Sequence, residues 1–262
     1  MLPGGLWRGG ELRRDFSFRP LSGDVELALA EAGRGRGSVP QRVTAVLSAA
    51  LASLGGDAAH PEAVRALPVA DRQYLMRQLA ARLGMEETWF AASCARCGTG
   101  FDFPVRHGEL PFKPAEEGYP FAAVETSLGP VRFRVPNGAD QEVIAVIDDP
   151  EEARRALARR CAAEPLPGDL SDEDLARVEQ ALEEVAPEVV IRAQVACPDC
   201  GRPSEVHLDP YVCLGAVDGG LFHEIHALAS AYHWSESEIL ALPRDRRRLY
   251  LSLVDQGRGM AS

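Results

Sequence analysis

The feature that most constrains this chain is a pair of short cysteine motifs, Cys94-Ala-Arg-Cys97-Gly98 and Cys197-Pro-Asp-Cys200-Gly201. Two residues between the cysteines let both sulfurs point at one ion about 2.3 Å away. The glycine permits a tight turn that a side chain would obstruct. Two such knuckles supply four thiolates, enough for one closed tetrahedral zinc site. We therefore expect Cys94, Cys97, Cys197 and Cys200 to bind one structural Zn²⁺ that has no open position for catalysis.

The distance between the knuckles along the chain is unusual. Residues 98–196 separate them, whereas ordinary zinc ribbons leave about 15–20 residues between knuckles. The sequence therefore predicts a zinc ribbon with a large insertion, and a metal that joins distant parts of the chain. Two redox dithiols or surface thiols remain the alternative, although a thioredoxin-like motif expects one Cys-x-x-Cys beside a βαβ pattern.

Composition excludes several other classes. The 262 residues carry a net charge of −11, which argues against the basic footprint of a nucleic-acid-binding protein. Six cysteines in a chain of this length do not make a disulfide scaffold. We expect Cys161 and Cys213 to be buried free thiols and the protein to work in the reducing cytoplasm. No apolar run is long enough to span a bilayer, and Met1 to Arg14 lacks the apolar region of a signal peptide.

Hydrophobic periodicity and capping signals predict an α+β fold. Apolar residues at helical spacing indicate helices, with Ser171 and Ser235 opening capping boxes and Asp149 capping a helix that begins at Pro150. Trp89 and Phe90 are expected to pack the ribbon onto the preceding helices. The expected helices cover residues 41–54, 71–83, 139–147, 172–186 and 221–232, and the expected strands cover 101–105, 123–126, 131–135 and 189–195.

These elements predict helical N- and C-terminal parts around a split four-cysteine zinc ribbon with an inserted β-hairpin and helical segment. The expected parts are an N-terminal extended segment with helices (1–90), the split ribbon (91–105 and 189–212), the insertion (106–188) and C-terminal helices (213–262). Twelve acidic residues and five arginines lie between Asp148 and Ala186. Such a run is an interaction surface or, more commonly, a solvated helical face.

The C-terminal part raises two further readings. His223, Glu224 and His226 invite a metalloprotease interpretation, but that motif needs histidines four residues apart. A second metal site formed by His223, His226 and His233 stays open beside ordinary hydrogen-bonded histidines. Two short helices with a basic corner are also compatible with a helix-turn-helix, although the acidic chain disfavours DNA binding.

Several segments in order carry a resemblance to a known family. They are Phe16-Ser-Phe-Arg-Pro-Leu-Ser-Gly23, Asp71-Arg-Gln-Tyr-Leu-Met-Arg-Gln-Leu79, Phe133-Arg-Val-Pro-Asn-Gly-Ala-Asp140 and Trp234-Ser-Glu-Ser-Glu-Ile-Leu-Ala-Leu-Pro243. Together with the knuckles, this order resembles the T-even-phage-type baseplate hub assembly chaperones of contractile phage tails and extracellular contractile injection systems. The resemblance implies a non-enzymatic assembly factor whose partners are baseplate or tail hub proteins. The knuckle cysteines alone are carried over from the family.

The leading hypothesis is therefore a cytoplasmic, zinc-stapled assembly chaperone or minor baseplate component, with no small-molecule substrate, nucleic acid or membrane as its partner. A generic zinc-ribbon adaptor associated with nucleic acid, and an enzyme with a structural zinc, are the alternatives. The C-terminal segment from Leu221 to Val254 is expected to contact the partner. Trp234 lies at a break between helices, and a positive corner orients an acidic partner. The residues of that corner are Arg244, Arg246, Arg247 and Arg248.

Overall fold

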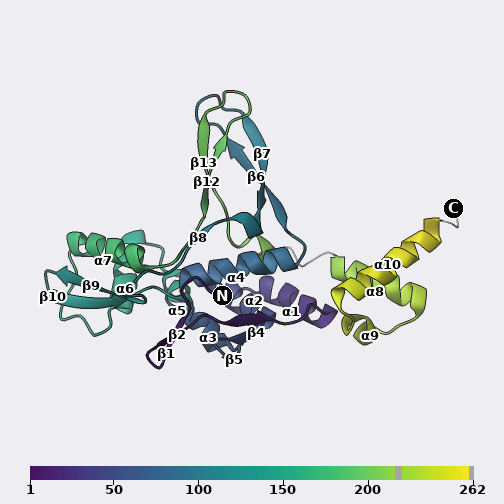
Figure 1. Cartoon of the computed structure of the whole chain (residues 1–262), viewed down its shortest axis with the longest axis horizontal. Coiled ribbons are helices and arrows are strands. Elements are labelled where there is room, and N and C mark those ends of the chain that lie inside the picture. Colours follow the sequence, from purple (N-terminus) through teal and green to yellow (C-terminus); the bar gives the residue numbers. More distant parts are fainter. Residues whose placement is uncertain (216–219, 260–262) are drawn as a thin grey trace.

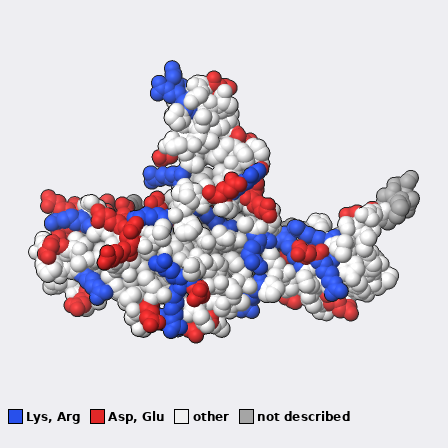
Figure 2. All heavy atoms as spheres, viewed as in Figure 1, with Lys and Arg blue, Asp and Glu red and all other residues white. Residues whose placement is uncertain are grey.

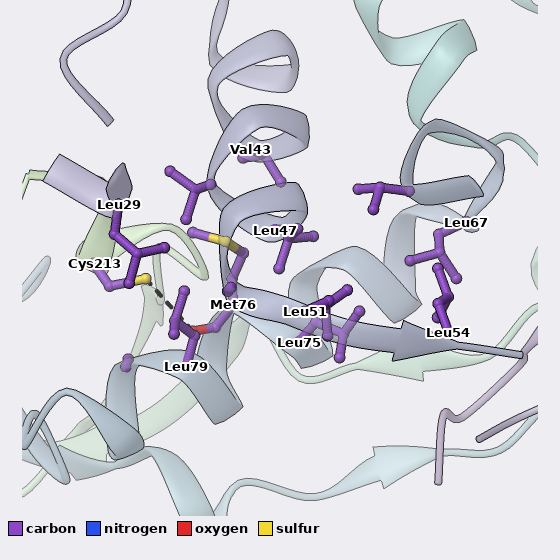
Figure 3. Packing of buried hydrophobic residues seen from close by; sticks show 14 of the residues in the cluster. Leu29, Val43, Leu47, Leu51, Leu54, Leu67, Leu75, Met76, Leu79 and Cys213 are labelled. Carbon is purple, nitrogen blue, oxygen red and sulfur yellow. Dashed lines mark hydrogen bonds between the residues drawn. The ribbon is translucent and has the colours of Figure 1, made fainter. Parts of the chain in front are cut away.

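Four helices of the N-terminal third form the central body of the protein, seen in a computed structural model that describes residues 1–215 and 220–259 (Figure 1). They are α1 (Gly23–Gly33), α2 (Val39–Ala50), α3 (Pro61–Ala66) and α4 (Val69–Arg82). Ser22 caps α1 by accepting a hydrogen bond from the Val25 amide, and a capping box opens α2. The apolar faces of the helices meet in the largest core of the chain, where Leu47, Leu75 and Met76 have no exposed surface (Figure 3).

A small sheet closes one side of this body. Its strands are β3 (Phe16–Phe18), β4 (Leu51–Leu54) and β5 (Asp57–Ala58), in that order. The helix expected over residues 41–54 is therefore wrong at its C-terminal end, because Leu51–Leu54 pairs with strands on both sides. Gly55 and Gly56 have φ of +63° and +88° and form the turn of a hairpin. Helices α1 and α3 were not expected.

Two hairpins lie beside each other and project from the body as a β lobe (Figure 1). One pairs β6 (Glu87–Ser93) with β7 (Gly100–Arg106), and the other pairs β12 (Arg192–Ala196) with β13 (Pro203–His207). Among the described residues, Phe103, Val105 and Leu208 form the buried part of its core, and partly buried apolar side chains surround them. Trp89 is 64% exposed, so the expectation that it packs the ribbon onto the helices is wrong, whereas Phe90 packs into the lobe.

The insertion forms a second lobe with its own core (Figure 1). The expected hairpin is confirmed as β9 (Phe121–Thr126) and β10 (Gly129–Arg134), which pack against α6 (Pro150–Cys161) and α7 (Asp172–Val185). Phe133 and Cys161 are fully buried between these elements. The side chains of Asp149 and Ser171 cap the two helices as the sequence predicts.

The insertion is tied to the central body at three places. The short strands β8 (Phe112–Lys113) and β11 (Glu188–Val189) pair at its base, and the ring of Phe112 meets Tyr74 of α4 edge-on at 5.3 Å between centroids. Helix α5 (Gly138–Ile144) packs against α2 and α3, and Glu142 accepts from Arg65 at 2.9 Å. The Tyr119 hydroxyl donates to the Gly5 carbonyl at 3.0 Å, next to the N-terminal hairpin of β1 (Leu6–Arg8) and β2 (Glu11–Arg13).

The C-terminal helices form the third projection (Figure 1). They are α8 (Gly220–Tyr232), α9 (Glu236–Leu240), which begins at the expected Ser235 capping box, and α10 (Arg244–Gly259). Before them along the chain lies the short 3-10 helix η2 (Val212–Gly215), which follows β13. A second short 3-10 helix, η1 (His107–Glu109), follows β7. Cys213 is buried against α4, as expected, with its sulfur 3.5 Å from the Met76 carbonyl. No helix in the two described stretches has both the length and the apolar character needed to span a membrane.

Candidate metal centre

The two cysteine knuckles form the turns of the two hairpins of the β lobe. Each has the same local geometry. The Gly98 amide donates to the Cys94 carbonyl at 2.9 Å, and the Gly201 amide donates to the Cys197 carbonyl at 2.9 Å. Both glycines have positive φ, +74° and +68°, which is the conformation that glycine adopts without a steric penalty. The hairpin turn therefore explains why each Cys-x-x-Cys pair is followed by glycine.

The fold brings the two knuckles together although residues 98–196 separate them. The Cys94 and Cys200 sulfurs are 3.6 Å apart, as are those of Cys97 and Cys197. All four sulfurs lie within 4.8 Å of one another. A tetrahedral site with metal–sulfur bonds of about 2.3 Å requires sulfurs about 3.8 Å apart. The predicted four-cysteine cluster is thus confirmed, and its dimensions suit a metal ion such as zinc.

The electrostatics of the cluster also suit a cation. A hydrogen bond from the Cys97 amide lowers the pKa of Cys94 to about 6. A hydrogen bond with the Thr99 hydroxyl lowers the pKa of Cys97. The Arg202 amide favours the Cys200 thiolate, but burial and the neighbouring sulfurs outweigh it and raise the pKa of Cys200 to about 12. The chain thus favours the first thiolates, whereas the last requires a positive charge among the sulfurs.

One polar contact joins the knuckles beyond the sulfurs. The Thr99 hydroxyl donates to the Asp199 carboxylate at 2.7 Å, across the two turns. The position of Thr99 directly after the first Cys-x-x-Cys-Gly was the available signal, but no local pattern links it to a residue of the other knuckle. The contact helps to fix the relative orientation of the two turns.

The donor set of the cluster is four cysteine sulfurs. Four thiolate ligands fill a tetrahedral ion and leave no position for a substrate or a water nucleophile. Within residues 1–215 and 220–259, these four cysteines are the one group of three or more potential ligand residues close enough to hold a metal ion. His223, His226 and His233 are exposed and do not form such a group.

The arginines predicted to form a partner surface differ in their exposure to solvent. Arg246 and Arg248 are exposed on α10, and Arg244 is partly buried. The prediction is wrong for Arg247, whose side chain has no exposed surface. Helical spacing turns Arg247 towards α1 and α8, where Glu26 accepts from it at 2.8 Å and Glu224 at 2.5 Å.

Trp234 is half-buried in an aromatic cluster. Its ring stacks on Tyr232 at 4.8 Å between centroids and meets Tyr250 edge-on at 4.9 Å. The cluster joins the end of α8 to α10 and orients the two helices. Trp234 therefore helps to position α8 against α10, and its side chain stays partly exposed.

Comparison of the chain with protein-family models, with curated proteins and with solved structures finds no match.

Proposed function

We propose that the four cysteines bind one Zn²⁺ and that the protein is a non-enzymatic assembly factor acting by protein–protein binding. Four thiolates in a closed tetrahedron are the typical donor set of structural zinc. The order of segments that resembles baseplate hub assembly chaperones supplies the setting: assembly of the baseplate hub of a contractile tail or injection system, in the cytoplasm. The partners are then baseplate or tail hub proteins.

The observation that carries this proposal is a set of exposed apolar side chains on the C-terminal helices. Leu249 and Leu253 are 60% and 48% exposed and lie one turn apart on α10. Phe222 on α8 is 47% exposed. Apolar side chains that gather on one projecting element mark interaction sites more often than single exposed ones do. The exposed Arg246 and Arg248 add positive charge to this element, in a chain whose net charge is −11.

Co-expression with tail components tests the proposal. The protein is produced with the products of adjacent sheath, tube, spike and baseplate genes, and complexes are isolated through a tag on this chain. We expect Leu249→Ser/Leu253→Ser to lose the complex while circular dichroism stays unchanged. Val146→Ser is the matched control, because Val146 is 73% exposed on a different part of the molecule. Arg246→Glu/Arg248→Glu should weaken the complex and remove its salt dependence.

Two results would contradict the proposal. One is the absence of any complex with every tail component. The other is a complex that the folded α10 variants and the Val146 variant retain equally, which would place the contact elsewhere.

A zinc-ribbon adaptor associated with nucleic acid is the second candidate, and one observation favours it. The Trp89 ring is exposed on β6 of the β lobe, and exposed aromatic rings stack on unpaired bases. Polarisation with labelled single-stranded DNA and RNA tests it. Sub-micromolar binding that weakens with salt and is lost in Trp89→Ala would favour this candidate over the first.

A further inference from the structure

An apolar cavity lies where the insertion meets the central body. It has a volume of about 340 Å³ and is open to solvent. Its walls come from the start of α4, from α6 and α7, and from β11 with the residues on either side of it. The apolar residues of its lining include Val69, Leu157, Cys161, Val178, Leu182 and Val189. Cys161 and Val178 belong to the core of the insertion lobe, so one face of that core forms the floor of the cavity.

The rim of the cavity is acidic. Glu179, Glu183 and Glu188 lie on it with a single arginine, Arg154. Arg154 already forms two hydrogen bonds with Glu179, at 2.6 and 2.7 Å. Within the described part of the chain, Glu183 and Glu188 form no ion pair. Figure 2 shows acidic side chains, with basic ones among them, over the side of this lobe that carries α7.

We propose that this cavity is a docking site for an amphipathic helix of a partner protein, whose apolar side chains enter the cavity and whose lysines or arginines face Glu183 and Glu188. Helix-in-groove recognition uses apolar anchors spaced three and four residues apart. The unpaired carboxylates stand at the rim and the floor is apolar, so the occupant is apolar at its centre and basic at its flanks. Such charges also steer a basic partner to this cavity, which is called the groove below, and they repel an acidic partner.

This inference rests on the proposed function and deepens it by adding a second contact of stated chemistry. The charge around this second site is opposite to the charge of the α10 surface. The α10 surface is apolar and basic, and the groove is apolar and acidic. A helix in the groove touches α4 of the central body on one side and α6 and α7 of the insertion on the other. Its binding therefore fixes the insertion against the body.

A peptide assay with the full-length protein tests the groove. The probe is a fluorescein-labelled amphipathic peptide of about 18 residues with leucines at helical spacing flanked by lysines, and its counterpart has glutamates in place of the lysines. Fluorescence anisotropy is expected to show at least about tenfold tighter binding of the lysine peptide. Hydrogen exchange should place the protection on α6, α7 and residues 188–191.

Two kinds of variant locate the binding. Ala158→Phe fills the floor, since Ala158 lines the cavity, and should abolish binding of both peptides. Glu183→Arg/Glu188→Arg should reverse the preference towards the glutamate peptide. The matched control is Glu31→Arg/Glu125→Arg, which makes the same change of charge at exposed positions on α1 and β9 and should bind as the wild type does.

Equal affinity for both peptides, or equal weakening by the control variant, would overturn the inference. So would a cavity that binds the apolar dye Nile red, loses it in Ala158→Phe and takes up neither peptide, because that result assigns the cavity to small apolar molecules. If Ala158→Phe fails to fold, the charge reversal still decides. The assay contains no tail protein, so its outcome is independent of whether the chain assembles with a baseplate hub.

Discussion

Removal of the metal should unfold the β lobe and leave the rest of the protein folded. Three side chains, Phe103, Val105 and Leu208, form the buried core of that lobe, and seven further apolar side chains that are only partly buried pack against it. At about 1.5–3 kcal/mol for each buried side chain, the three contribute about 5–9 kcal/mol of transfer free energy. Structural zinc sites contribute about 10–16 kcal/mol. Metal binding is therefore expected to contribute more free energy to folding of the lobe than these three side chains do. The core of the central body, by contrast, has eighteen buried residues among those described and does not contain the cysteine cluster.

The three tryptophans of the chain allow this to be measured part by part. Trp7 lies on β1, Trp89 on β6 of the β lobe, and Trp234 between α8 and α9. In protein labelled with 5-fluorotryptophan, excess chelator should move the ¹⁹F signal of Trp89 to its position in the unfolded chain and leave the other two unchanged. Hydrogen exchange should show loss of amide protection in the strands of the β lobe only.

Serine variants give the matching genetic test. Cys97→Ser should purify with less zinc than the one ion per chain that we expect for the wild type, and it should resemble the chelated protein. Cys161→Ser and Cys213→Ser replace buried thiols outside the cluster and should keep the zinc. A wild-type protein that is free of metal and fully protected in the β lobe would refute the reasoning.

Three further predictions concern charges. Arg247→Ala removes the hydrogen-bonded partner of the buried Glu26, which keeps the longer ion pair with Arg244 at 3.8 Å, and it also removes the partner of Glu224. This variant should lower the free energy of unfolding by about 3–5 kcal/mol, whereas Arg246→Ala, at an exposed position, should change it by less than about 0.5 kcal/mol in urea titrations. Burial raises the pKa of the Asp71 carboxyl to about 6 from 3.8, so the folded state binds the carboxyl proton more tightly than the unfolded state does. The stabilisation of the fold by this protonation is present below about pH 4 and is lost as pH rises through about 6. The unfolding free energy of the wild type relative to Asp71→Asn should therefore fall by about 3 kcal/mol between about pH 4 and 7, and a difference independent of pH would contradict the shift. Wild-type protein at physiological salt should show no sub-micromolar affinity for nucleic acid in a gel-shift assay, because its net charge is −11.

The parts of the fold that were predictable depend on local chemistry. The knuckles and the caps at Asp149, Ser171 and Ser235 are fixed by residues within a few positions, and the structure confirms them. The end of α2 is not fixed in this way. Leu51 and Leu54 continue the helical spacing of the residues before them, but they pair with β3 and β5, which lie on either side along the chain. Pairing with these two strands makes residues 51–54 a strand, and hydrophobic periodicity alone could not distinguish this strand from a continued helix.

The direction of single side chains was the other limit. Trp89 and Phe90 are neighbours on one strand, so only one of them can face the core, and the lobe buries Phe90. The same holds on α10, where the sequence shows a basic run but not which arginine turns inward. Arg247 does so because Glu26 of α1 and Glu224 of α8 lie on that side. The acidic partners are 221 and 23 residues away, and no local pattern links them.

The sequence also predicted a metal that joins distant parts of the chain, with the insertion between the knuckles, and the structure shows further attachments of this insertion. The pair of β8 and β11 joins Lys113 to Glu188. With this pair formed, zinc closes a loop of 23 residues, 98–112 and 189–196, in place of the 99 residues of 98–196. Loop-closure entropy then differs by only about 1 kcal/mol, so the metal adds little to the placement of the insertion. Chelated protein should therefore bind the lysine peptide with a dissociation constant within about twofold of the zinc-loaded value, measured by anisotropy. A large loss of peptide binding on chelation would show that the insertion depends on the metal and that the attachments at β8, α5 and Tyr119 do not hold it.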